Sequence, residues 1–164
     1  MSDTYAVSER LNFIGFDQSA RETLRSLRPF LQAEIQPALS VFYAKLRDTP
    51  KVRSFFKDES HISAAAGAQS RHWGVIAGAQ FDETYVNGVR TIGQTHARIG
   101  LEPRWYIAGY ALITEALLRR VIETRWPKAI GGRAKGAKEA ADAVGALVKA
   151  MMLDMDFALS IYLE

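Results

Sequence analysis

The sequence lacks cysteine altogether, which excludes disulfides, zinc–thiolate centres and cysteine-ligated clusters. It has only three histidines, His61, His72 and His96, and their separation does not match a dedicated metal-binding spacing such as H-x-x-x-H. No stretch approaches the ~18 consecutive apolar residues of a membrane span. Residues 1–4 carry neither a basic segment nor an apolar run, so we expect no signal peptide and a cytoplasmic protein.

An excess of charge of one sign is also missing. The 21 basic residues are scattered among 18 acidic ones, for a net charge of +3, which does not suggest nucleic-acid binding. The motifs G-x-x-x-x-G-K-[ST], H-E-x-x-H and G-x-S-x-G are all absent, and this argues against common nucleotide-binding and hydrolytic enzymes. With 48% apolar residues in 164, the composition predicts one folded domain over residues 1–164.

Helical periodicity fills nearly the whole chain, and no segment shows a convincing period of two. We therefore predict an all-α domain of about seven helices. Asp17, Asp82 and either Asp58 or Ser60 are expected N-caps, and Gly100 is an expected C-cap. The predicted helices cover residues 18–27, 31–46, 61–77, 82–100, 102–126 and 137–163, with a short turn around Phe55 and Phe56 and a loop around Pro127 and Gly131–Gly136.

His96 is the most informative histidine because it shares an apolar stripe with Val89, Ile92 and Ile99, one turn before Gly100. One interpretation is a core histidine bonded to a backbone carbonyl. The other is a haem ligand, since an imidazole on an apolar helix face is what haem iron takes as its proximal ligand. Spacing alone does not decide between them.

A longer pattern surrounds this histidine. Residues 96–110 read H-x-R-I-G-L-x-P-x-W-Y-x-x-x-Y, and ordered shorter pieces precede them: Phe42-Tyr43-x-x-Leu46, Pro50, Phe55-Phe56, Gln69-x-x-His72-Trp73 and Phe81-Asp82-x-x-Tyr85. Together they closely resemble the haem-binding domain of globin-coupled sensors. The resemblance extends over about residues 8–163, nearly the whole chain.

This resemblance implies a globin-like fold with an extra N-terminal segment and a bound haem b. His96 would be the iron ligand, and the Tyr43 hydroxyl would face the other side of the haem and donate a hydrogen bond to bound dioxygen. Taken alone, Tyr43 would be an ordinary core aromatic. The further cofactor contacts that the resemblance implies are Phe42, Phe56, His61, Ala65, Ala68, Val89, Ile92, Ile99, Trp105 and Tyr106.

The helix that starts near His61 is expected to form the wall facing Tyr43. His61, Ala65, Ala68 and His72 share one helix face. His61 would lie at the pocket rim, near a haem propionate, whereas His72 is expected to be structural. Members of the family often have a leucine at the position of Ala65 and a hydroxylated residue near Ala68. The alanines predict a roomier pocket with fewer polar groups.

The function that the resemblance implies is a haem-based gas sensor without enzymatic activity of its own. Dioxygen is the expected signal, with carbon monoxide and nitric oxide as alternatives. The domain would be the input part of a longer signalling protein, and the ending at residues 153–163 resembles that of chemotaxis transducers. Diguanylate cyclase and histidine kinase outputs are alternatives. A catalytic globin, such as a nitric oxide dioxygenase or a peroxidase-like protein, and a haem-free interaction domain are the other hypotheses.

The last predicted helix indicates a homodimer. A coiled-coil-like seam is formed by Val144, Val148, Met151, Met155, Ala158 and Tyr162, and a second apolar edge by Leu147, Met152, Leu159 and Leu163. Part of this stripe is expected to face the chain's own core, but the two edges together are more apolar surface than one side of a helix can hide. We expect the helix to pair with residues 106–126 of the partner in a four-helix bundle.

Overall fold

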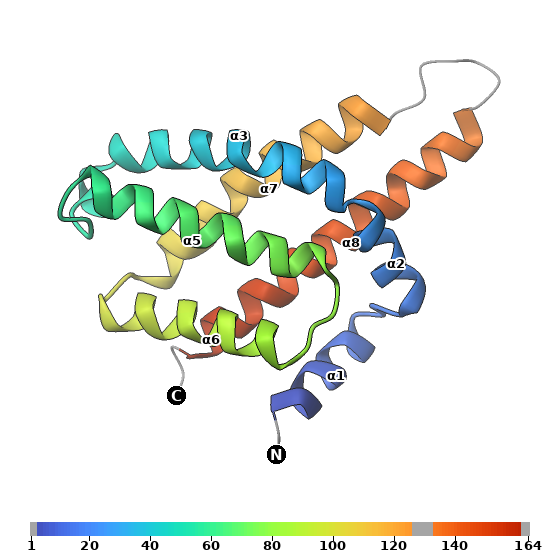
Figure 1. Cartoon of the computed structure of the whole chain (residues 1–164), viewed down its shortest axis with the longest axis horizontal. Helices are drawn as coiled ribbons and strands as arrows, with labels where there is room; N and C mark the ends of the chain where they lie inside the picture. The colour runs from blue at the N-terminus through green and yellow to red at the C-terminus, as the bar shows by residue number, and fades with distance from the viewer. Residues whose placement is uncertain (1–2, 126–132, 162–164) are drawn as a thin grey trace.

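A computed structural model describes residues 3–125 and 133–161, which form eight α-helices and, in those ranges, no strand (Figure 1). The all-α prediction is confirmed, and the predicted number of about seven helices is corrected to eight. The helices are α1 (Asp3–Phe13), α2 (Gln18–Ser26), α3 (Arg28–Arg47), α4 (Pro50–Arg53), α5 (Glu59–Ala77), α6 (Glu83–Arg98), α7 (Pro103–Arg125) and α8 (Arg133–Ser160).

Helix α1 was not predicted from the periodicity, and the four-residue helix α4 lies where only a short turn was expected. Val7 and Leu11 lie one turn apart and are both buried, while Phe13 is 92% exposed. Two apolar anchors in a short helix leave too weak a pattern to be recognised. After α1, Gly15 adopts a φ of +62°, a backbone conformation that favours glycine, and the chain turns into α2.

The predicted helix starts follow from local capping chemistry. Asp17, Asp58 and Asp82 each accept a hydrogen bond from the backbone N–H three residues later, at 2.9, 2.8 and 3.1 Å. Asp58, not Ser60, is therefore the cap of α5, which starts at Glu59 and not at His61.

Two other boundaries differ from the prediction. Helix α3 begins at Arg28, so Pro29 lies in its first turn, where the missing N–H of proline costs no helical hydrogen bond. Helix α8 begins at Arg133, inside the predicted glycine-rich loop. Pro127 and Gly131 lie outside the described residues.

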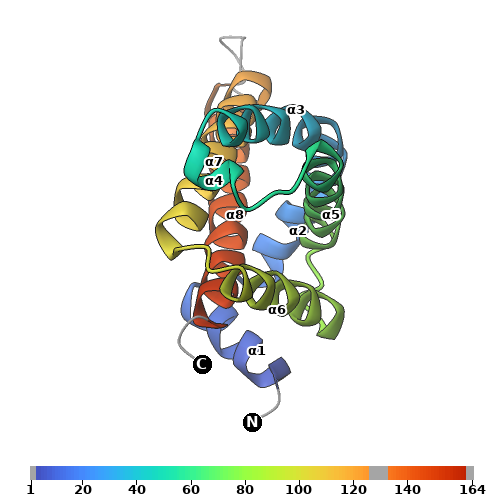
Figure 2. The same ribbon diagram turned by 90° about the vertical axis from the view of Figure 1, so that its left-hand side faces the viewer.

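The long helix α8 packs against α2, α6 and α7, while α3 packs against α5 and α7. Turned by 90°, the ribbon shows α3, α5, α6 and the α7–α8 pair on four sides of a central region (Figure 2). None of the helices in the described ranges is both long and apolar enough to span a membrane.

The predicted seam on α8 only partly faces outward. Met151 and Ala158 are fully buried in the chain's own core, so these two residues belong to the part of the stripe that was expected to face inward. The other three described residues of the seam, Val144, Val148 and Met155, are only partly buried. Met152, from the second predicted edge, is 43% exposed, whereas Leu147 is fully buried. Tyr162 and Leu163 lie outside the described residues.

Candidate functional site

Residues from α3 to α7 enclose a cavity of about 570 Å³. Apolar side chains form most of its wall, together with a few hydroxyl, amide and imidazole groups. Ten of the residues proposed from the sequence line it: Phe42, Tyr43, Phe56, Ala65, Ala68, Ile92, His96, Ile99, Trp105 and Tyr106. The structure therefore brings together residues from four helices and from the loop before α5.

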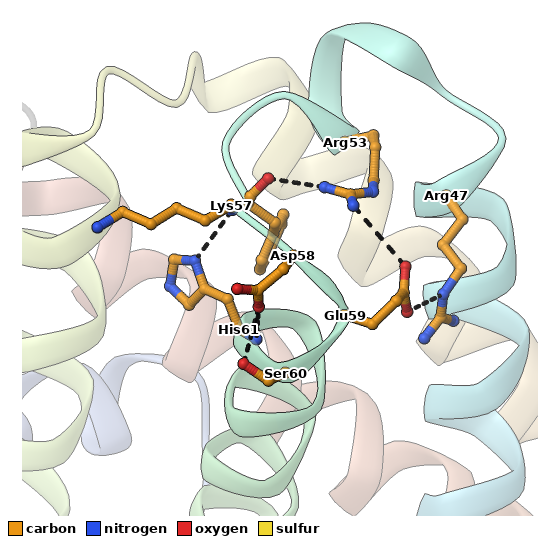
Figure 3. A network of polar contacts seen from close by, with 8 residues as sticks. Arg47, Arg53, Lys57, Asp58, Glu59, Ser60 and His61 are labelled. Carbon is orange, nitrogen blue, oxygen red and sulfur yellow. Dashed lines mark hydrogen bonds and ion pairs between the residues drawn. The ribbon is translucent and has the colours of Figure 1, made fainter.

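Two proposed residues do not line this cavity. Val89 is fully buried in the core of the domain. His61 is exposed on the first turn of α5, where its ring packs edge-on against Phe56 with the ring centroids 5.3 Å apart. Its Nδ1 accepts a 3.4 Å hydrogen bond from the backbone N–H of Lys57 (Figure 3). His61 thus lies behind Phe56, one side chain away from the cavity.

Charged side chains hold the loop that carries Phe56. Arg53 donates a 2.7 Å hydrogen bond to the Phe56 carbonyl, and its guanidinium lies 3.8 Å from the Glu59 carboxylate. Arg47 on α3 contacts the same carboxylate at 2.9 Å (Figure 3). These contacts tie the end of α3, α4 and the start of α5 to one another at the rim of the cavity.

Helix α6 ends on the glycine cap that the sequence predicts. Gly100 has a φ of +72°, its N–H donates to the Ala97 carbonyl, and the N–H of Leu101 donates to the carbonyl of His96, both at 3.0 Å. This pair of bonds is a Schellman motif, which allows the chain to reverse sharply. As a result His96, at the end of α6, and Tyr106, near the start of α7, lie side by side.

The His96 ring is tilted against the Tyr106 ring, with the centroids 5.0 Å apart. Its Nδ1 is buried and has no hydrogen-bond partner in the described part of the chain, so no backbone carbonyl holds it there. Burial lowers the pKa of His96 to about 4, which keeps the imidazole neutral at physiological pH. A neutral imidazole has a lone pair free to bind a metal ion.

Trp105 supplies a second unpaired polar group to the same part of the wall. Its indole N–H is buried and has no partner among the described residues. A buried, unmatched donor is unfavourable in an empty protein interior. Both unpaired nitrogens of the cavity wall therefore belong to the segment from His96 to Trp105.

Tyr43 on α3, unlike His96 and Trp105, has a hydrogen-bond partner for its polar group. Its hydroxyl donates a 3.1 Å hydrogen bond to Oε1 of Gln69 on α5, and its ring packs edge-on against Phe42. Burial raises the pKa of Tyr43 to about 12, so the phenol keeps its proton. Sequence reasoning placed Gln69 within a motif but gave it no role. Its position one turn after Ala65, on the same helix face, was the available signal.

A buried polar cluster lies beside the cavity and joins three helices. Asp154 of α8 is fully buried. It accepts a hydrogen bond from the Tyr110 hydroxyl of α7 and lies 2.7 Å from Nε2 of His72 on α5. Burial, together with the charge of Asp154, raises the pKa of Tyr110 well above its usual range. Sequence reasoning missed Asp154, although a lone carboxylate on the apolar stripe between Met151 and Met155 was a signal.

In the described ranges, no three histidine or carboxylate side chains come together as a metal site. Of the two histidines that line the cavity, His72 is bonded to Asp154, which leaves the His96 imidazole as the potential metal ligand. One imidazole on an apolar wall suits a cofactor that brings its own remaining ligands.

The helical arrangement and this cavity together define an all-α, globin-like domain. The chain belongs to the Protoglobin family, whose pattern matches residues 3–164.

The relatives include several sensor proteins. The heme-based aerotactic transducer HemAT of Halobacterium salinarum is 21% identical over 99% of this chain, and the chain spans about a third of that relative, 33% of its length. The globin domain of the Geobacter sulfurreducens globin-coupled sensor superposes with a TM-score of 0.83 at 18% identity, covering 96% of this chain and 97% of that one. The ferric globin domain of E. coli DosC has a TM-score of 0.69 at 18% identity, with the same coverage.

Proposed function

We propose that the domain binds haem b through His96 and acts as a gas sensor. The observation that carries the proposal is the buried, neutral imidazole of His96, whose Nδ1 has no partner among the described residues, on the wall of an apolar cavity. The cavity of about 570 Å³ falls within the range of about 300–1,000 Å³ typical of small-molecule sites. The residues present therefore fit a flat, largely apolar cofactor that needs one imidazole ligand.

Bound haem would supply a ferrous iron that takes up a diatomic gas reversibly. Dioxygen is the proposed signal, because it becomes partly negative on binding and is stabilised by a hydrogen-bond donor in a dry pocket. Tyr43 is suited to that role, since it lines the cavity and its high pKa keeps it protonated. Carbon monoxide, a poorer acceptor, would gain less from the same donor.

Absorption spectra test this proposal. The purified, reduced protein is expected to show a five-coordinate ferrous haem spectrum that changes on addition of dioxygen. His96→Ala should abolish that spectrum and the stoichiometric haem content. His61→Ala is the matched control, because His61 is exposed and does not line the cavity. Haem retained in His96→Ala with an unchanged spectrum would show that the ligand assignment is wrong.

Ring contacts support a route from His96 towards α8. Tyr106 packs against His96, and its ring centroid lies 5.2 Å from that of Tyr110, whose hydroxyl bonds to Asp154 on α8. We propose that movement of His96 on gas binding passes along these side chains to α8, and from there to an output module. Spatial adjacency is the support for this route. Crystal structures without ligand and with carbon monoxide should differ at Tyr106 or in the helix that carries it, and superposition within error would refute the route.

A homodimer is the proposed assembly, with a chemotaxis transducer as the output. Ile107 and Ile122 of α7 and Met152 of α8 are 46%, 47% and 43% exposed, so apolar side chains remain on the two helices expected to pair. The transducer output is supported by the aerotactic relative of Halobacterium salinarum. Light scattering at micromolar concentration tests the dimer, and a haem-loaded monomer would contradict it.

A further inference from the structure

The hydroxyl group of Tyr43 already donates a hydrogen bond within the protein. It points to Oε1 of Gln69 at 3.1 Å, and both residues line the cavity. A phenol has a single O–H donor, so it cannot fully serve two acceptors at once. Any gas molecule that takes the Tyr43 proton must therefore replace the Gln69 carbonyl as acceptor.

The neighbouring residues do not offer Tyr43 a second acceptor from the same helix. Ala65 and Ala68, which face the cavity from α5, have no polar side-chain atoms. His72 faces it too, but its Nε2 is taken by Asp154 at 2.7 Å. Among the described lining residues of α5, Gln69 is thus the side chain that determines where the Tyr43 hydroxyl points.

We propose that Gln69 is a positioning residue that competes with the gas ligand for the Tyr43 proton and thereby lowers the affinity for dioxygen. The inference rests on the proposed function, because it requires dioxygen to bind in this cavity. The physical basis is thermodynamic linkage. The Tyr43–Gln69 hydrogen bond exists only in the ligand-free state, so it must break when the ligand binds, and its free energy weakens the observed binding by the same amount. Gln69 therefore acts through Tyr43 and does not itself need to touch the ligand.

Two substitutions at the same position should have opposite effects. Gln69→Leu has a similar size but removes the acceptor, so the Tyr43 hydroxyl is free for the ligand. The dioxygen affinity should rise by about two- to tenfold, the range expected for one neutral hydrogen bond. Gln69→Glu replaces the amide by a charged acceptor, which binds a donor roughly twice as strongly. The affinity should then fall, by about two- to tenfold.

Two controls separate this role from a general packing effect. Gln36 of α3 donates a 2.8 Å hydrogen bond to Ser70 of α5, so Gln36→Leu removes another bond between the same two helices, at residues that do not line the cavity. It should leave the dioxygen affinity unchanged. In a Tyr43→Phe background, Gln69→Leu should have no further effect, because the proton for which it competes is gone.

Carbon monoxide provides a spectroscopic measurement that does not depend on affinity. A donor near the outer atom of the bound gas lowers the C–O stretching frequency. Gln69→Leu should therefore increase the population with the lower frequency and Gln69→Glu should decrease it, while Gln36→Leu should match the unmodified protein.

The sign of the Gln69→Leu effect decides the inference. Lower dioxygen affinity in both Gln69→Leu and Gln69→Glu would show that Gln69 supports the ligand-bound state, which overturns the competition. Unchanged affinity in both variants would also overturn it. If haem or dioxygen does not bind to the unmodified protein, the proposed function itself fails. The two failures are therefore distinguishable.

Discussion

The two sides of the cavity differ in how many of their buried polar side-chain groups are hydrogen-bonded, although Tyr110 of α7 is bonded to Asp154 as well. On the side of α3 and α5, the Tyr43 hydroxyl is bonded to Gln69, and His72 is bonded to Asp154. On the side of α6 and α7, the buried Nδ1 of His96 and Nε1 of Trp105 have no partner among the described residues. Paired polar groups stabilise the fold, whereas unpaired ones cost stability until a ligand satisfies them. The bonded groups on the first side therefore contribute to the stability of the haem-free fold, whereas the unpaired nitrogens of His96 and Trp105 do not.

Mutations on the two sides should therefore differ in their effect on the stability of the haem-free protein. Removal of a paired group should destabilise the protein because its partner is left buried and unsatisfied. Removal of an unpaired group should leave the haem-free protein as stable as before, or more so, while it abolishes binding.

The largest loss is expected for Asp154→Ala. This change removes a fully buried carboxylate and leaves His72 and Tyr110 without their partner. Breaking such a buried network typically costs about 3–5 kcal/mol. Urea unfolding of the haem-free protein measures it. Asp142→Ala on the same helix is the control, because Asp142 pairs with Lys138 at the solvent-exposed surface, where an ion pair contributes little to stability. Equal losses in the two variants would contradict the structural role of the cluster.

The second expectation concerns pH and the opposite side of the cavity. The pKa of His96 is about 4 in the folded protein, below the ordinary value of about 6.5 in the unfolded chain. The unfolded chain therefore takes up a proton first, and stability present above pH ~6.5 is lost as the pH falls towards 4, by at most about 3 kcal/mol.

His96→Phe should remove this part of the pH dependence and should not destabilise the haem-free protein at pH 7. The measurement is a series of urea unfolding curves between pH 7 and pH 4. A His96→Phe protein as pH-dependent as the unmodified one would show that the imidazole is not held neutral by burial.

Third, Tyr43→Phe should weaken dioxygen binding. A donor to a charged acceptor contributes about 1.5–3 kcal/mol, which corresponds to a dissociation rate faster by roughly one to two orders of magnitude. Because the hydroxyl also gives up its bond to Gln69, we expect the lower end of this range. Carbon monoxide dissociation should change much less. Stopped-flow kinetics with both gases provides the measurement, and equal effects on the two would indicate a steric role for Tyr43.

The sequence predicted the features that depend on local chemistry. Asp17, Asp82 and Gly100 cap helices as expected, because each cap involves residues within a few positions of one another. Helix α1 was missed, since two buried side chains do not make a recognisable periodic pattern.

Pairings between distant helices could not be predicted in the same way. Asp154 meets His72 and Tyr110 across 82 and 44 positions of the chain, and Tyr43 meets Gln69 across 26. Such contacts depend on how the helices pack against one another. Helical periodicity predicts the helix face on which a residue lies, but not the residue of another helix that it contacts. For the same reason His61 shares a helix face with Ala65 in the sequence but packs behind Phe56 in the structure.

The smallest effect is expected in the turn between α6 and α7, which holds His96 next to Tyr106. Gly100 has a φ of +72°, and a Cβ there would touch nothing, so Gly100→Ala measures backbone strain alone. The cost of the left-handed conformation is about 1–2 kcal/mol. Gly145→Ala on α8 also meets open space but has a helical backbone, and it should stabilise the protein by roughly 0.5–1 kcal/mol. Unfolding curves should therefore shift in opposite directions for the same chemical change. Two shifts of the same sign would mean that the Schellman turn does not hold the end of α6 in solution.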